Sequence, residues 1–289
     1  MVVRIPLFLI AAALAPGTGA AQPQRPQPAA AGPAAQAPQP TISYADLADL
    51  ALTAPVAAHV RLRRALALRP AEAAGVAPGY TRFYLETEVV ALIRGEPGMP
   101  TELSYLVDLP NDARGRPARP ERRSEWLIFA RTVAGPPGAL QLAAPDAQLP
   151  FTPDAAERTR AILRAAVAAD APPAISGIGR AFHTPGSVTG TSETQFFLQT
   201  ARNQPISITV SREAGAQPRW FVSMSEFVDA GATQPRRDSL LWYRLACFLP
   251  AQLPATSFAD AREHVGAIAA DYQLVRQGLG PCQRLRARR

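Results

Sequence analysis

The sequence predicts a β-rich α+β fold, in which a small N-terminal barrel or sandwich precedes an antiparallel meander that ends in a C-terminal helix. Three observations predict it. Residues 80–95 (YTRFYLETEVVALIRG) alternate apolar and polar side chains over a length unusual for one strand. Three shorter alternating segments lie between residues 194 and 225. Residues 258–275 carry apolar side chains at intervals of three and four, which is the helical pattern.

The N-terminal region predicts export. Residues 1–20 combine a basic start at Arg4 with a short apolar core and small residues before Ala21, which is the pattern of a signal peptide. Residues 21–40 are almost wholly Ala, Pro, Gln and Gly, so we expect a disordered spacer. No later segment is long and apolar enough to span a membrane. The expected location is therefore periplasmic or secreted.

The composition excludes several chemistries. The chain of 289 residues has a formal charge of +7, and all of its 30 basic residues are Arg. Schiff-base catalysis, a P-loop and Ser-x-x-Lys acylation each need a Lys amine, so none of them applies. The two cysteines, Cys247 and Cys282, predict a structural disulfide in an exported chain.

The first unit, residues 41–150, combines a short helix with four or five strands. Ser43 is placed to cap a helix over residues 41–52. The next segment, residues 56–68, alternates until Arg64, which indicates a bulge, although its Ala content also fits a helix. After Glu88 both faces of the long strand become apolar, which predicts cover on both sides. The further expected strands cover residues 102–109, 126–130 and 139–143.

The order of these strands resembles that of OB-type barrels of the netrin/TIMP-like sort. The segments VVALIRG (89–95) and EWLIFAR (125–131) carry the resemblance, together with the long loop between the two central strands. The cysteine framework of that family is absent here. The resemblance implies an OB-like barrel as the fold of this unit, and it assigns no binding residue.

A bridging helix, residues 151–172, is predicted to join this barrel-like unit to a second one, residues 173–283. Thr152-Pro153-Asp154 is a helix start, and Pro172 ends the segment. In the second unit, residues 240–249 fit a helix or a buried strand. The last helix is expected to start at a Ser257 cap and to end near Gly278. The Arg-rich tail, residues 284–289, is expected to fray.

No residue pattern in the sequence predicts a catalytic, metal-binding or cofactor-binding site. The three histidines, His59, His183 and His264, are not spaced as paired metal ligands. We expect His59 on a wet strand face, and His183 in a Gly/Pro/Thr loop where it can meet a substrate. Glu86 and Glu88 share one strand face with Arg neighbours, which predicts a salt-linked surface rather than an acid–base pair.

The sequence therefore favours an exported, non-enzymatic envelope protein that binds or scaffolds a partner. The partner is unknown; an anionic envelope surface, reached through the Arg-rich loop at residues 114–123, or another protein fits the pattern. Nucleic acid is not expected, because no aromatic residues are interleaved with the arginines. The alternative is a periplasmic hydrolase or isomerase assembled around His183. Its candidate binding residues are Arg180, His183, Trp220 and Glu226.

Overall fold

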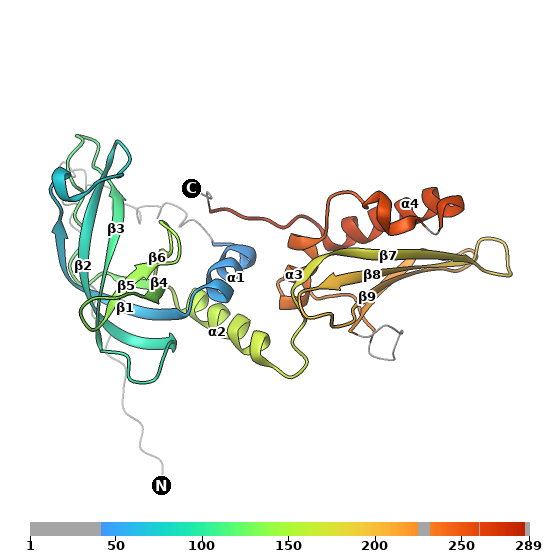
Figure 1. The fold of residues 1–289 in the computed structure, drawn as a ribbon, viewed down its shortest axis with the longest axis horizontal. Helices are drawn as coiled ribbons and strands as arrows, with labels where there is room; N and C mark the ends of the chain where they lie inside the picture. The colour runs from blue at the N-terminus through green and yellow to red at the C-terminus, as the bar shows by residue number, and fades with distance from the viewer. Residues whose placement is uncertain (1–41, 225–231, 260, 287–289) are drawn as a thin grey trace, which may run out of the picture. The chain divides into compact units, whose positions relative to one another are not determined.

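The computed structural model describes residues 42–224, 232–259 and 261–286, and the chain from Ile42 onward forms one compact unit. The expected signal peptide and spacer, residues 1–40, lie outside the described residues, as do Glu226 and residues 287–289. The fold is β-rich, with a closed five-stranded barrel, a second antiparallel sheet and a C-terminal helix (Figure 1). The predicted fold class is confirmed, and the division of this part into domains stays a prediction.

The first sheet closes into the predicted OB-like barrel. Its strands are β1 (Val56–Ala67), β2 (Tyr80–Arg94), β3 (Glu102–Pro110), β4 (Glu125–Thr132), β5 (Ala139–Leu142) and β6 (Gln148–Pro150). Their order is β1-β2-β3-β5-β4-β6. An additional antiparallel pairing of β1 with β4 closes β1, β2, β3, β5 and β4 into the five-stranded barrel, and within the described chain β6 pairs only with β4. Only β3 and β5 are parallel, through Ser104 and Tyr105. The core is built from the inward side chains of these strands, such as Phe83 and Leu85.

The long strand β2 covers the predicted residues, and its pairing with β1 is irregular. The register between the two strands shifts at three places, one of them between Leu62 and Arg64, where the sequence indicates a bulge. Such shifts let a long pair of strands curve around a barrel. The second half of β2 is not covered on both sides, because Val90 and Leu92 are 42% and 45% exposed. These two apolar side chains therefore face solvent, and the prediction that this half of the strand is covered on both faces is wrong.

Two helices follow their predicted caps. α1 (Tyr44–Thr53) starts after Ser43, whose hydroxyl accepts a hydrogen bond from the Asp46 N–H at 3.0 Å. α2 (Pro153–Val167) starts after Thr152, whose hydroxyl accepts from the Ala155 N–H at 3.1 Å. Each cap satisfies a backbone donor that the helix itself leaves unpaired. The sequence signals for both starts are confirmed.

The second sheet contains one strand more than predicted. Its strands β7 (Ile175–Pro185), β8 (Ser192–Thr200), β9 (Ser207–Arg212) and β10 (Arg219–Ser223) are antiparallel, in the order β10-β9-β8-β7. The expectation of a loop around His183 is wrong, because this residue lies on β7 and pairs with Thr194. β7 has glycines and a bulge between Ile178 and Ala181, so its sequence lacks the alternation by which strands are recognised.

The remaining helices pack on this sheet. The segment left open between helix and strand is a helix, α3 (Leu240–Phe248), capped by Ser239. α4 (Val265–Leu279) lies along the sheet (Figure 1), and Tyr272 packs on Phe196 with ring centres 5.6 Å apart. Ser257 does not cap α4; it lies in a separate 3₁₀ turn, η2 (Ala255–Phe258), and its hydroxyl donates to the Ile178 carbonyl. The helix ends at Leu279, and its C-cap is Gly280, with φ of +69°, two residues after the predicted Gly278.

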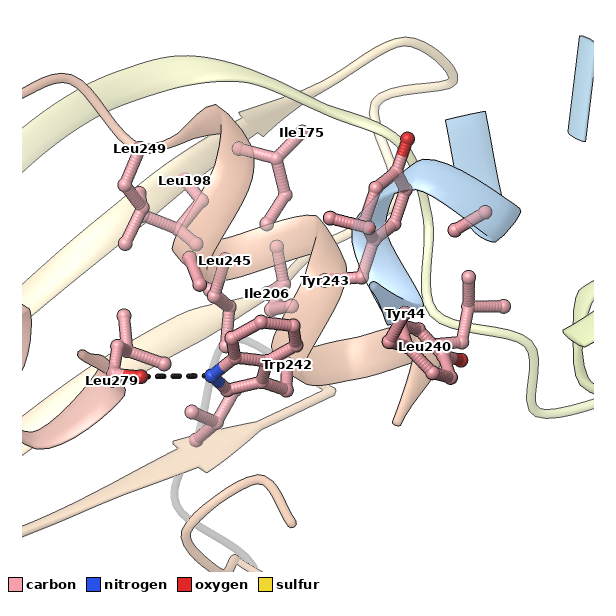
Figure 2. Close-up of a cluster of buried hydrophobic side chains, with 14 of the residues drawn as sticks. Tyr44, Ile175, Leu198, Ile206, Leu240, Trp242, Tyr243, Leu245, Leu249 and Leu279 are labelled. Atoms are coloured by element: carbon pink, nitrogen blue, oxygen red, sulfur yellow. Dashed lines mark hydrogen bonds between the residues drawn. The ribbon is translucent and has the colours of Figure 1, made fainter. Parts of the chain in front are cut away.

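A buried cluster joins α1, α3 and the second sheet. Figure 2 shows Trp242 and Tyr243 of α3 among Leu, Ile and Tyr side chains, and the Trp242 indole N–H donates to the Leu279 carbonyl at 2.8 Å. Cys247 and Cys282 form the predicted disulfide, with a Cα–Cα distance of 5.0 Å. The bond holds the segment after α4 against the end of α3, and so fixes where the C-terminal residues start.

Candidate functional site

A basic groove on the barrel is the clearest candidate for a binding site. This cavity of about 830 Å³ is lined by side chains of β1, β2 and β4 and by the end of the β3–β4 loop. Its charged lining consists of four guanidinium groups and two carboxylates, which leaves an excess of positive charge. The charged residues are Arg61, Arg63, Glu88, Arg122, Arg123 and Glu125.

Arg122 and Arg123 lie at the groove because the loop that carries them is anchored to β1. The Leu62 N–H donates to the Ser124 carbonyl at 2.9 Å, and a turn from Glu121 to Ser124 places the two arginines just before this anchor. Arg123 has φ of +65°, a left-handed conformation that costs a non-glycine residue about 1–2 kcal/mol. Within the described chain neither side chain has a hydrogen-bond or ion-pair partner. Both guanidinium groups are therefore available to a ligand.

The other arginines of the groove are held by carboxylates. Arg61 donates from Nε and Nη2 to one oxygen of Glu125, at 3.0 and 2.8 Å, and His59 Nε2 lies 2.9 Å from the other oxygen. These hydrogen bonds from Arg61 and His59 lower the pKa of the Glu125 carboxyl, which keeps it ionised. Our expectation of a wet His59 is wrong: it is 7% exposed and stacked on Phe151.

The predicted salt-linked surface borders the same groove. Arg63 of β1 lies 3.1 Å from Glu88 of β2, and Arg64 lies 3.6 Å from Glu86. Both pairs are exposed, so they orient side chains more than they stabilise the fold. Glu86 and Glu88 are thus each held in an ion pair with an arginine of β1.

A second cavity, of about 550 Å³, opens where β3 and β5 part. Leu106, Val133 and Leu142 contribute apolar walls, and its charged lining is Arg82 with Asp108. These two side chains neutralise each other through two hydrogen bonds of 2.7 and 2.9 Å. The cavity therefore has no unpaired charge to direct an ionic ligand, in contrast to the groove at Arg122 and Arg123.

The structure does not bring the sequence-predicted candidates together. Arg180 lies at the bulge of β7 and is exposed, whereas Trp220 is 6% exposed and its indole lies against Gly278 of α4. The cross-strand row runs from His183 through Thr194 and Val210 to Trp220, so about three strand spacings, roughly 14 Å, separate the two ends. Glu226 is outside the described residues.

His183 instead belongs to a polar cluster that the sequence analysis missed. Its Nδ1 lies 2.8 Å from the Thr194 hydroxyl, which lies 2.5 Å from the carboxylate of Asp271 on α4. Arg212 of β9 donates to the other Asp271 oxygen, and the ring of His264 lies 5.0 Å from that of His183. Asp271 stands beside Tyr272 and next to the apolar positions of α4. An acidic residue in such a stripe signals a buried ionic partner.

Neither a protein-family model nor any curated protein sequence matches this chain. Among the described residues, no helix combines the length and hydrophobicity that crossing a bilayer requires.

Proposed function

We propose that this protein is an exported, non-enzymatic binding protein that holds an anionic component of the cell envelope in the basic groove of its barrel. The observation that carries the proposal is the pair Arg122 and Arg123, two guanidinium groups with no partner within the described chain, in the lining of a cavity with excess positive charge. Guanidinium groups bind phosphate and carboxylate oxygens through paired, charge-assisted hydrogen bonds.

The backbone at Arg123 supports the proposal independently. A left-handed arginine costs free energy that Gly or Asn would largely avoid, and such local strain is found most often at binding sites. The signal-like residues 1–20 and the disulfide Cys247–Cys282 support a periplasmic or secreted location. Phosphate groups are the shared chemistry of the envelope ligands that fit the groove, namely lipid headgroups and soluble acidic polymers.

The test compares two double variants of the full chain. Arg122→Ser/Arg123→Gly removes the two groove arginines, and Arg114→Ser/Arg119→Ser removes the same charge from exposed positions of the same loop. Binding is measured to a short polyphosphate and to vesicles with phosphatidylglycerol. We expect the groove variant to weaken polyphosphate binding by about tenfold or more and the control variant to change it little.

The outcomes separate the sources of the ligand. Binding to both probes supports a phosphate site, and binding to vesicles alone supports recognition of lipid headgroups. Equal losses in the two double variants would mean that only the overall charge matters, which overturns the groove as the site. Absence of binding to both probes also overturns the proposal.

The second candidate is a hydrolase or isomerase built around His183. The hydrogen-bonded series Asp271–Thr194–His183 favours it, because such a series can orient an imidazole for proton transfer. Turnover of ester or peptidyl-prolyl substrates that disappears in His183→Ala would support this reading over the binding protein. Turnover that persists in this variant would exclude His183 as its source.

A further inference from the structure

The imidazole rings of His183 and His264 lie next to each other at the β7 edge of the second sheet. His183 comes from β7, and His264 is the residue immediately before α4. Their ring centres are 5.0 Å apart and their planes are inclined by 51°. His183 is partly buried and the His264 side chain is 30% exposed, so the pair is accessible to small solutes.

The hydrogen bonds fix which nitrogen of His183 carries the proton. Asp271 is 1% exposed; one of its oxygens accepts two hydrogen bonds from Arg212, and the other accepts from Thr194. The Thr194 hydroxyl must then donate its proton to Asp271 and accept from His183 Nδ1–H. Nε2 of His183 is left as an unprotonated nitrogen with a free lone pair.

The hydrogen bonds of His183 are those of a metal-binding imidazole, because Nδ1–H donates to an oxygen that is itself held by a carboxylate. A neutral imidazole whose second nitrogen donates to an oxygen is the state in which histidine binds transition metals. Arg212 does not repel a cation strongly here, because Asp271 compensates its charge.

We propose that His183 and His264 together bind one divalent transition-metal ion, with Thr194 and Asp271 orienting His183. Two imidazoles on one tetrahedral ion, each with a nitrogen–metal distance of about 2.0–2.1 Å, have ring centres about 5 Å apart. The observed separation of the rings matches this distance. Zn²⁺ and Cu²⁺ are the ions that imidazole ligands suit best.

Solvent completes the coordination of the ion. Within the described chain, no cluster of three or more His, Cys, Asp or Glu side chains is placed to hold a metal. The carboxylate of Glu263, whose side chain is 81% exposed, lies 3.4 Å from His264 Nε2. An ion held by two imidazoles keeps positions open for water or an exogenous ligand, so we expect an exchangeable ion rather than a structural one.

The experiment titrates the full chain with Cu²⁺ by calorimetry and records the electron paramagnetic resonance spectrum of the product. We expect one ion per chain and a spectrum with hyperfine coupling to two imidazole nitrogens. His183→Ala and His264→Ala should each lose at least about tenfold in affinity. Thr194→Val, which keeps both imidazoles, should lose about tenfold or more, as is usual when a partner that orients a metal ligand is removed.

The control is His59→Gln, which removes the third imidazole and keeps a hydrogen-bond donor toward Glu125. We expect it to bind Cu²⁺ like the unmodified chain, and circular dichroism establishes that every variant is folded. Saturable uptake that is unchanged in His183→Ala, or a spectrum with fewer than two imidazole nitrogens, overturns the site. An unchanged affinity in Thr194→Val overturns the orienting role. Because the groove arginines are intact in all these variants, polyphosphate binding tests the proposed function separately.

Discussion

Arg284 donates two hydrogen bonds to Asp49, at 2.6 and 3.1 Å, across 235 positions of the chain. The same carboxylate accepts from the Tyr243 hydroxyl at 2.6 Å. Beside it, the N–H groups of Leu285 and Arg286 donate to Asp46, and Arg286 pairs with Asp146. Residues 284–286 therefore form a strap over α1, and the expectation of a frayed tail is wrong for this part of it.

The strap should contribute to the stability of the fold. Arg284 and Asp49 are 22% and 21% exposed, so their interaction is only partly screened by water. We expect Arg284→Ala to lower the free energy of unfolding by about 1–2 kcal/mol, measured in urea. The control is Arg69→Ala, which breaks the exposed pair with Glu72 and should leave the urea midpoint unchanged. Equal midpoints for the two variants would show that the strap does not stabilise the fold.

The disulfide should stabilise the same region. It closes a loop of 35 residues, and the chain-entropy model gives about 3–4 kcal/mol for a loop of that length. We expect the Cys247→Ala/Cys282→Ala variant to unfold at lower urea concentration. Hydrogen exchange of the α1 amides should rise in parallel, because the strap begins just after Cys282. Unchanged hydrogen exchange in α1 would mean that the disulfide is not needed to hold the strap on α1.

The stability of the protein should fall in mildly acidic solution because of His183. The fold lowers the pKa of His183 below its ordinary value of 6.5, while Asp271, Arg212 and His264 surround the ring. The unfolded chain therefore takes up a proton at higher pH than the folded chain. This contribution to stability is present above about pH 6.5 and is lost as the pH falls below it. His183→Gln should flatten the stability curve between about pH 7 and pH 5; parallel curves would falsify the assignment.

Gly138 should be essential for closing the barrel. It has φ of +82°, its carbonyl accepts from the Ser104 N–H, and an added Cβ would lie 2.2 Å from the Glu102 carbonyl oxygen. We expect Gly138→Ala to cost more than about 2 kcal/mol, seen as a lower Tm. Gly75→Ala is the matched control, because φ is +78° there and nothing lies within 4 Å. Equal shifts in Tm would mean that only the left-handed backbone matters.

Arg123 should lower the free energy of unfolding of the protein and at the same time contribute to ligand binding in the groove. Arg123→Gly removes the left-handed strain, so we expect the free energy of unfolding to rise by up to about 1 kcal/mol. The same change should weaken polyphosphate binding. Thermal unfolding and binding are measured on one preparation, and a variant that gains stability without losing affinity would contradict a role for Arg123 in the groove.

Sequence patterns predicted the elements whose side chains repeat at a regular interval. The alternation of side chains predicts β2, and the Thr152–Pro153 start predicts α2. The sequence of α3 leaves helix and strand open, because a run of ten residues that is apolar except for Arg244 fits both structures. β7 was missed because a bulge and glycines interrupt its pattern. Local signals identify local structure well, and they fail where tertiary contacts decide.

The surroundings of the candidate functional side chains are set by contacts between residues far apart in the sequence. His59 looked exposed from its strand parity, but Phe151 and Glu125, both far along the chain, cover it. Thr194 and Asp271 lie 77 positions apart, so no spacing rule connects them to His183. The cluster of arginines at residues 114–123 was visible in the sequence, whereas the division into paired and unpaired side chains needed the fold.

The carboxylate of Asp46 accepts from Ser43, at the beginning of the described chain, and from Leu285, near its end. A chain that is synthesised or translocated with its amino end first makes Asp46 and Asp49 long before their partners appear. The first helix therefore cannot acquire its full set of hydrogen bonds until residues 284–286 have been made. Until then its two aspartates wait for partners that come more than 200 positions later in the chain.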